Sequence, residues 1–158
     1  MANHYSKPSE QHFGVAHALG LAGLVPFVLG ALGVFLLPLP WQGVVIQAFL
    51  YYSALILSFL GGIHWGVGMS QDRVNSAEFN ARLGISVVPS LLAWPALFLD
   101  VRYAMLVLMG GFLFMRFYER QGESIDRLPA WYRSIRTWLT AIVVLAHLTI
   151  IVRVSSVL

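Results

Sequence analysis

Five basic or imidazole side chains lie in or beside the apolar stretches, at a similar distance from the same side of the membrane. With a rise of about 1.5 Å per residue, they fall at the level of the inner leaflet. Clustered there, they could bind an anion or an anionic lipid headgroup. Alternatively, the arginines could extend to the headgroups and set topology, while the central histidine bonds a neighbouring helix. The five residues are His17, His64, Arg82, Arg116 and Arg136.

The histidines also permit a cofactor hypothesis, because His17 and His64 share a depth and two histidines can hold a haem iron. Other metal chemistry is disfavoured. The chain has no cysteine, and no two histidines have the i, i+3 or i, i+4 spacing that gives a shared metal face. We therefore expect no metal or other cofactor, with haem as the alternative.

The stretch "SFLGGIHWGVG" places glycines on both sides of His64 in a helical span. Small residues at i, i+4 spacing let helix backbones approach closely. The predicted seam contains Ala54, Ser58, Gly62, Gly66 and Ser70. Gly61 and Gly68 share the face of His64 and are expected to leave room around its ring, with Trp65 beside the seam.

The acidic residues all fall outside the apolar cores of the expected helices, Glu119 among them. Coupled transporters usually keep a carboxylate at mid-membrane, so this distribution disfavours a proton- or ion-coupled transporter. The sequence also lacks a serine-nucleophile motif and a phosphate-binding loop. We therefore expect a protein that is not an enzyme.

Composition decides the fold class. Of the 158 residues, 58% are hydrophobic and 11% charged, with a mean hydropathy of +0.74, which is typical of membrane proteins. A spanning helix needs about 20 apolar residues, and five such stretches follow a polar tail over residues 1–14. We predict an all-α bundle of five transmembrane helices, forming a single domain over 15–158. The expected helices are 15–37, 44–68, 79–99, 101–118 and 134–154.

The basic residues predict the orientation. With five spans, Lys7 and seven arginines fall on the side of the N-terminus, whereas Arg102 and Arg153 fall on the other side. The positive-inside rule then places the N-terminus in the cytoplasm. This asymmetry also accounts for the pI of about 9.6 without a nucleic-acid partner.

Several segments resemble a known family. They are "GLVPFVLGAL", "YYSALILSFLGGIHWG", "RLGISVVPSLLAWPALFL" and "WYRSIRTWLT". They look like the bacterial domain-of-unknown-function 3429 proteins, which are related to mitochondrial transmembrane protein sixty-nine. The resemblance runs from Gly20 to Leu148, and it implies a small multi-pass protein of the bacterial inner membrane, of unassigned activity.

Three functions remain open. The first is a non-catalytic accessory subunit or assembly factor that packs against other membrane proteins or against further copies of itself. The second is a binding or transport module for a lipid or small anion, which would use the inner-leaflet cations. The third is a membrane protein with histidine-ligated haem.

Overall fold

The computed structural model describes residues 11–121 and 130–157, and within these ranges every regular element is an α-helix. The predicted all-helical membrane bundle is confirmed. The helices are α1 (Gln11–Ala22), α2 (Val25–Leu36), α3 (Leu39–Gln71), α4 (Ala77–Ala96), α5 (Val101–Tyr118) and α7 (Ala130–Val157). By length and composition, four stretches could cross a membrane: His17–Leu36, Leu39–Gln71, Val101–Tyr118 and Tyr132–Ser156.

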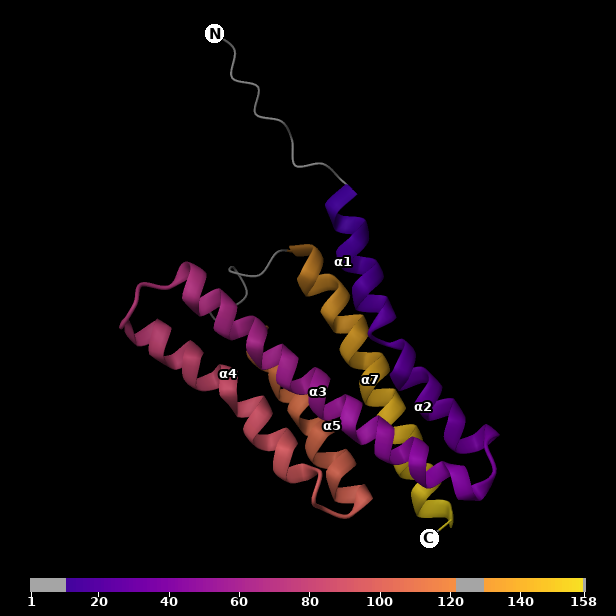
Figure 1. Cartoon of the computed structure of the whole chain (residues 1–158). Helices are drawn as coiled ribbons and strands as arrows, with labels where there is room; N and C mark the ends of the chain where they lie inside the picture. Colours follow the sequence, from indigo (N-terminus) through magenta and orange to yellow (C-terminus); the bar gives the residue numbers. More distant parts are fainter. Residues whose placement is uncertain (1–10, 122–129, 158) are drawn as a thin grey trace.

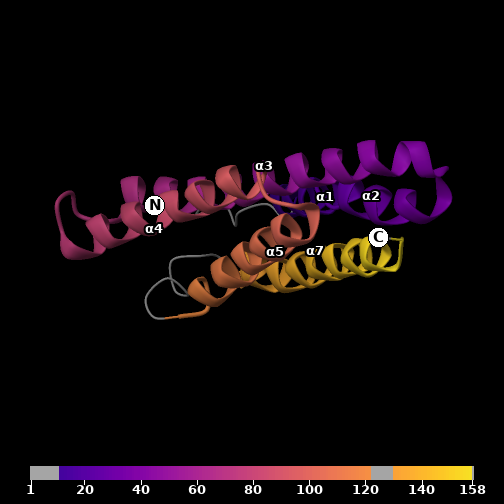
Figure 2. The same cartoon turned by 90° about the horizontal axis from the view of Figure 1, so that it is seen from below.

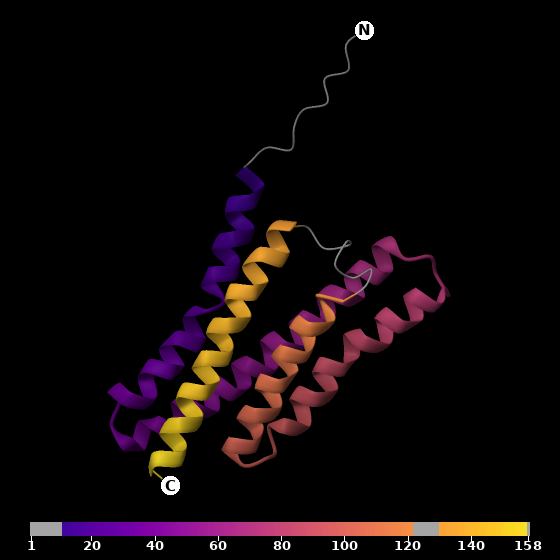
Figure 3. The same ribbon diagram turned by 180° about the vertical axis from the view of Figure 1, so that it is seen from behind.

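The chain passes back and forth along the bundle, so that α1 begins at one end and α7 finishes at the other (Figure 1). Seen from below, α1 to α4 form one layer and α5 and α7 a second (Figure 2). The view from behind shows α7 beside α1 and α2, and α5 between α7 and α4 (Figure 3). The third predicted helix, over 79–99, is α4, which packs along α3 and is not among these four stretches.

The first predicted helix, over 15–37, is two helices that meet at Gly23 and Leu24. Pro26 sits in the first turn of α2 and has no N–H to continue the ladder of α1. At the break, the Tyr52 hydroxyl donates a hydrogen bond to the Gly23 carbonyl over 3.0 Å. A side chain of α3 therefore satisfies a backbone group at the junction.

The remaining helices differ from their expected bounds mainly at their ends. Helix α3 begins at Leu39 rather than at residue 44, with Pro38 as its N-cap and Pro40 in its first turn. Proline is tolerated there because the first N–H groups of a helix have no partner within it. The Ser76 hydroxyl caps α4 by accepting from the Phe79 amide. Helix α7 extends beyond the expected 134–154 at both ends, and most of the expected polar tail, 1–10, lies outside the described residues.

An aromatic cluster fills the centre of the bundle. The Phe27 ring of α2 packs edge-on against Phe49 of α3 and Phe112 of α5, with centroids 5.4 and 6.0 Å away. His147 of α7 is fully buried among these three rings. Its Nδ1 lies 2.8 Å from the Val143 carbonyl, so that nitrogen donates. The cluster joins four helices and supports the cavity described below.

At the end of the bundle where α7 finishes, one arginine holds three helices together. The Arg153 Nε donates to the Val34 carbonyl of α2 over 3.1 Å, and an Nη atom lies 3.5 Å from the Gln42 side-chain oxygen of α3. Its guanidinium also lies over the Phe35 ring. The described arginines other than Arg102 and Arg153 lie towards the opposite end, so the predicted charge asymmetry is present in the fold.

Candidate functional site

A buried carboxylate joins three helices at the end of the bundle where α5 finishes and α7 begins. The Arg136 Nε of α7 lies 3.2 Å from each carboxylate oxygen of Glu119. On the other side of this carboxylate, the His64 Nε2 of α3 lies 3.7 Å from Oε1. All three side chains are nearly inaccessible, with relative exposures of 2% for Glu119, 6% for Arg136 and 1% for His64. We call these three residues the buried triad.

Helical spacing explains why each member faces inward. Arg136 begins the buried stripe of α7, which continues through Thr140, Val143 and His147. Glu119 caps the C-terminal end of α5, four residues after the buried Met115, and therefore lies on the same face. His64 occupies the corresponding core face of α3, where its ring packs edge-on against Tyr118 at 5.2 Å.

The electrostatics of Glu119 follow from this arrangement. Burial raises the pKa of Glu119, but the contact with His64 and the charge of Arg136 lower that pKa by more. The net shift is downward from the ordinary value of 4.5, because both neighbours favour the charged form. Glu119 is therefore an anion at neutral pH and compensates the charge of Arg136.

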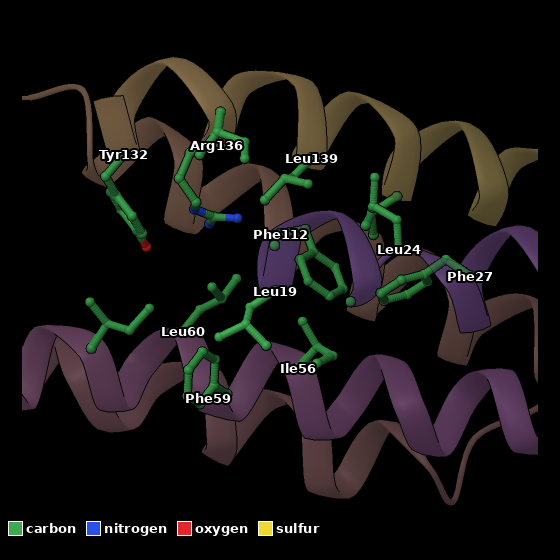
Figure 4. A pocket seen from close by; sticks show the side chains of 15 residues that line it. Leu19, Leu24, Phe27, Ile56, Phe59, Leu60, Phe112, Tyr132, Arg136 and Leu139 are labelled. Atoms are coloured by element: carbon green, nitrogen blue, oxygen red, sulfur yellow. The ribbon is translucent and has the colours of Figure 1, made fainter. Parts of the chain in front are cut away.

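A cavity of about 370 Å³ opens beside the buried triad. Figure 4 shows Arg136 and Tyr132 at one end of it and Phe27 and Phe112 towards the other, with aliphatic side chains between. Its walls come from α1, α2, α3, α5 and α7. Although the Arg136 Nε is bonded to Glu119, its buried Nη2 has no hydrogen-bond partner among the described residues. The cavity is thus an apolar channel with a guanidinium at one end.

The predicted cationic cluster is only partly assembled. Arg116 and Arg136 lie close enough to interact electrostatically, and Arg116 donates to the Thr137 hydroxyl over 2.6 Å. Arg82 is apart from them on α4, where its Nε donates to an Asp72 carboxylate oxygen over 2.7 Å. His17 lies half-buried on α1. Among the described residues, no three His, Cys, Asp or Glu side chains come together as a metal site.

Two positions of the predicted glycine seam make no contact with another helix of this chain. Gly62 and Gly66 are exposed, and a methyl group added to either would have no atom of another described helix within 4 Å. Gly61 makes the close approach instead, since a side chain there would collide with the Ser86 carbonyl oxygen of α4. A methyl group added at Gly68 would lie close to two side chains of α4, at 3.2 Å from a Leu83 methyl group and 3.3 Å from the Arg82 Cδ. The glycine of α3 that contacts α4 is therefore Gly61, one residue before the predicted Gly62.

The remaining predicted residues of this stretch divide between the two faces of α3. Ala54 is buried and Ser58 is half-buried, whereas Trp65 is 45% exposed. Trp65 borders a second, open groove between α3 and α4, together with Ser58 and Gly62. Trp65 thus lies beside the predicted stripe, but on the outer surface of the bundle.

Sequence reasoning missed Glu119. It follows the last residue of an apolar stretch, so a depth argument along the sequence places it in the loop. Its position in the helical repeat of α5, rather than its depth along the sequence, could have revealed its burial. Glu119 continues the series Leu108, Phe112 and Met115, which are all fully buried, at helical spacings of four and three residues.

Comparison with known proteins gives a family match and a curated relative. Residues 14–152 match the model of a family described as "Protein of unknown function (DUF3429)". Transmembrane protein 69 of Xenopus tropicalis is 36% identical over 129 residues, which is 80% of this chain and 49% of the relative. The chain thus spans about half the length of this curated relative. No solved structure matches.

Proposed function

Since the chain belongs to the DUF3429 family of multi-pass membrane proteins of unknown function, we propose its function from the geometry of the site. It binds an amphipathic lipid in the cavity beside the buried triad. The polar headgroup lies at Arg136 and Tyr132, and the apolar chain lies along the cavity towards Phe27 and Phe112. In this role the protein is a non-catalytic binding module in the bacterial inner membrane.

The single observation that carries this proposal is the unpartnered Nη2 of Arg136 at the end of an apolar cavity. A buried donor without an acceptor costs roughly 1–3 kcal/mol, and more when it is charged. An oxygen of a headgroup would supply the missing acceptor. The other lining residues offer almost entirely carbon surface, such as that of Ile56, Leu60 and Val143, which suits a hydrocarbon chain.

The position of the cavity mouth supports entry from the bilayer. Leu19 of α1 and Phe59 of α3 both line the cavity, and they are 68% and 64% exposed. Residues this exposed on a membrane bundle contact lipid chains. A lipid could therefore enter sideways between α1 and α3 without its apolar chain crossing water.

Native mass spectrometry from mild detergent tests the proposal. The wild-type protein should retain a lipid, and Ile56→Trp, which fills the cavity, should lose it. The matched control is Leu55→Trp, because Leu55 is the preceding residue of the same helix and faces outward with 65% exposure. Equal lipid retention in both variants would contradict binding in this cavity.

A second candidate, the accessory role, is supported by the open groove beside Gly62, Trp65 and Ser86. Small residues on an exposed face would let a transmembrane helix of another protein approach closely. Gly62→Leu should then leave the isolated protein as stable as wild type but abolish co-purification of the partner. Unchanged co-purification would argue against this groove as the contact.

A further inference from the structure

We infer that the headgroup bound at Arg136 carries one negative charge, and that it is taken up together with a proton on His64. This inference rests on the proposed function, because it assigns the ligand class and the regulation of the same cavity. It follows from the charges of the buried triad.

Glu119 compensates Arg136 in the unoccupied site. Its carboxylate accepts from the Arg136 Nε through both oxygens, so the buried pair has no net charge when His64 is neutral. An anion entering the cavity would then meet a guanidinium whose charge is already balanced. Burying a charge without a counter-charge is costly, so this state favours a neutral headgroup.

Protonation of His64 changes this balance. Its Nε2 lies 3.7 Å from Glu119 Oε1, and neither ring nitrogen has a hydrogen-bond partner among the described residues. A proton on His64 would give Glu119 two cationic neighbours and leave the triad with one positive charge. The open Nη2 of Arg136 would present that charge to the cavity. Histidine is the side chain whose charge ordinarily changes between about pH 5 and pH 8.

The other groups around His64 do not change the net charge of the buried triad. On α5, Tyr118 contacts the ring as a neutral aromatic group. On α4, Arg82 is paired with Asp72 at 2.7 Å. On α7, Tyr132 lies beside Arg136.

Two further arginines contribute less to the buried site. Arg116 and Arg120 are partly or fully exposed, so water and salt screen their charges. Protonation of His64 therefore changes the net charge next to the cavity.

The size of the cavity indicates one hydrocarbon chain rather than two. At about 370 Å³, the cavity lies near the lower end of the roughly 300–1,000 Å³ typical of ligand pockets. Together with the single uncompensated charge, this volume points to a single-chain amphipath with a monoanionic oxygen headgroup.

The test uses the full chain in nanodiscs of phosphatidylcholine, with tritiated hexadecyl sulfonate as the anionic probe and hexadecanol as the neutral one. A sulfonate keeps its charge throughout this pH range, so any pH dependence belongs to the protein. We expect sulfonate affinity to fall by roughly tenfold between pH 6 and pH 8, as linkage to one histidine allows. Hexadecanol affinity should not change.

Two variants test whether His64 causes the pH dependence of sulfonate affinity. In His64→Asn, sulfonate affinity should be low and independent of pH, whereas His17→Asn, a histidine of α1, should behave as wild type. A second measurement needs no variant: calorimetry in buffers of different ionisation enthalpy should detect proton uptake when wild type binds the sulfonate at neutral pH.

The outcomes separate the two proposals. If the sulfonate binds without pH dependence or proton uptake, or if His64→Asn keeps the dependence, the role of His64 is wrong and lipid binding stands. If hexadecanol binds more tightly than the sulfonate at both pH values, the anionic headgroup is wrong. If neither probe binds and wild type retains no lipid, the proposed function itself fails.

Discussion

The Arg136 Nε lies at the same distance, 3.2 Å, from both oxygens of Glu119, and the pair joins the C-cap residue of α5 to the second turn of α7 within the buried interior. The segment that connects these helices includes residues 122–129, which lie outside the described residues. The ion pair joins α5 and α7 directly through their side chains.

The first prediction concerns the stability of this pair. Glu119→Gln and Arg136→Gln should each lower the free energy of unfolding by about 3–5 kcal/mol, because each leaves one buried charge unpaired. The double variant Glu119→Leu with Arg136→Met should recover most of the loss, measured by denaturant titration in mixed micelles. Arg102→Gln is the control, since its pair with Asp100 is half-exposed and should contribute no more than about 1 kcal/mol. A double variant less stable than either single variant would contradict this account.

The second prediction is a pH dependence. The pKa of Glu119 is lower in the folded protein than its ordinary value of 4.5, so the unfolded chain binds the proton more tightly. The stability that Glu119 contributes is therefore complete above the ordinary pKa and is lost as the pH falls through the lower, folded value. The acid side of a melting-temperature profile should be steeper for wild type than for Glu119→Gln. Identical acid slopes would show that Glu119 is not stabilised as an anion.

The third prediction separates two adjacent glycines. Gly61→Ala should lower the free energy of unfolding by roughly 1–3 kcal/mol through overpacking, because the added methyl group meets the backbone of Ser86. Gly62→Ala is the matched control, and it should be neutral or slightly stabilising, since the site is open and alanine favours helix. Thermal stability in detergent measures both, and the opposite order would place the contact with α4 on the other face.

The fourth prediction concerns topology, and in particular whether α4 crosses the membrane. The chain has no cysteine, so single cysteines can be labelled from outside without background. We expect Leu99→Cys, between α4 and α5, to react with an impermeant maleimide in intact cells, and Arg73→Cys, between α3 and α4, to react only after permeabilisation. Labelling of both sites from the same side would show that α4 does not cross.

The fold was more predictable from the sequence than the site. Runs such as residues 44–68 are long and apolar. A helix is the structure that satisfies all the backbone hydrogen bonds of such a run within the membrane. The break at Gly23 and Leu24 was hidden because residues 15–37 remain apolar throughout. Which helix faces meet depends on crossing geometry, and a shift of one residue rotates a helix face by about 100°. That rotation separates Gly61 from Gly62. Glu119 was missed for a related reason, since its burial depends on the approach of α3 and α7.

The break between α1 and α2 divides the first membrane segment into parts with different mechanical constraints. Helix α2 is fixed at its far end by Arg153 and at its near end by the bond from Tyr52 to Gly23. Helix α1 packs chiefly on α7 and carries Leu19 at the cavity mouth. Local opening requires less free energy where few buried contacts are lost, so amide hydrogens of α1 should exchange faster than those of α2. Faster exchange in α1 would identify Gly23 and Leu24 as the boundary between these two parts.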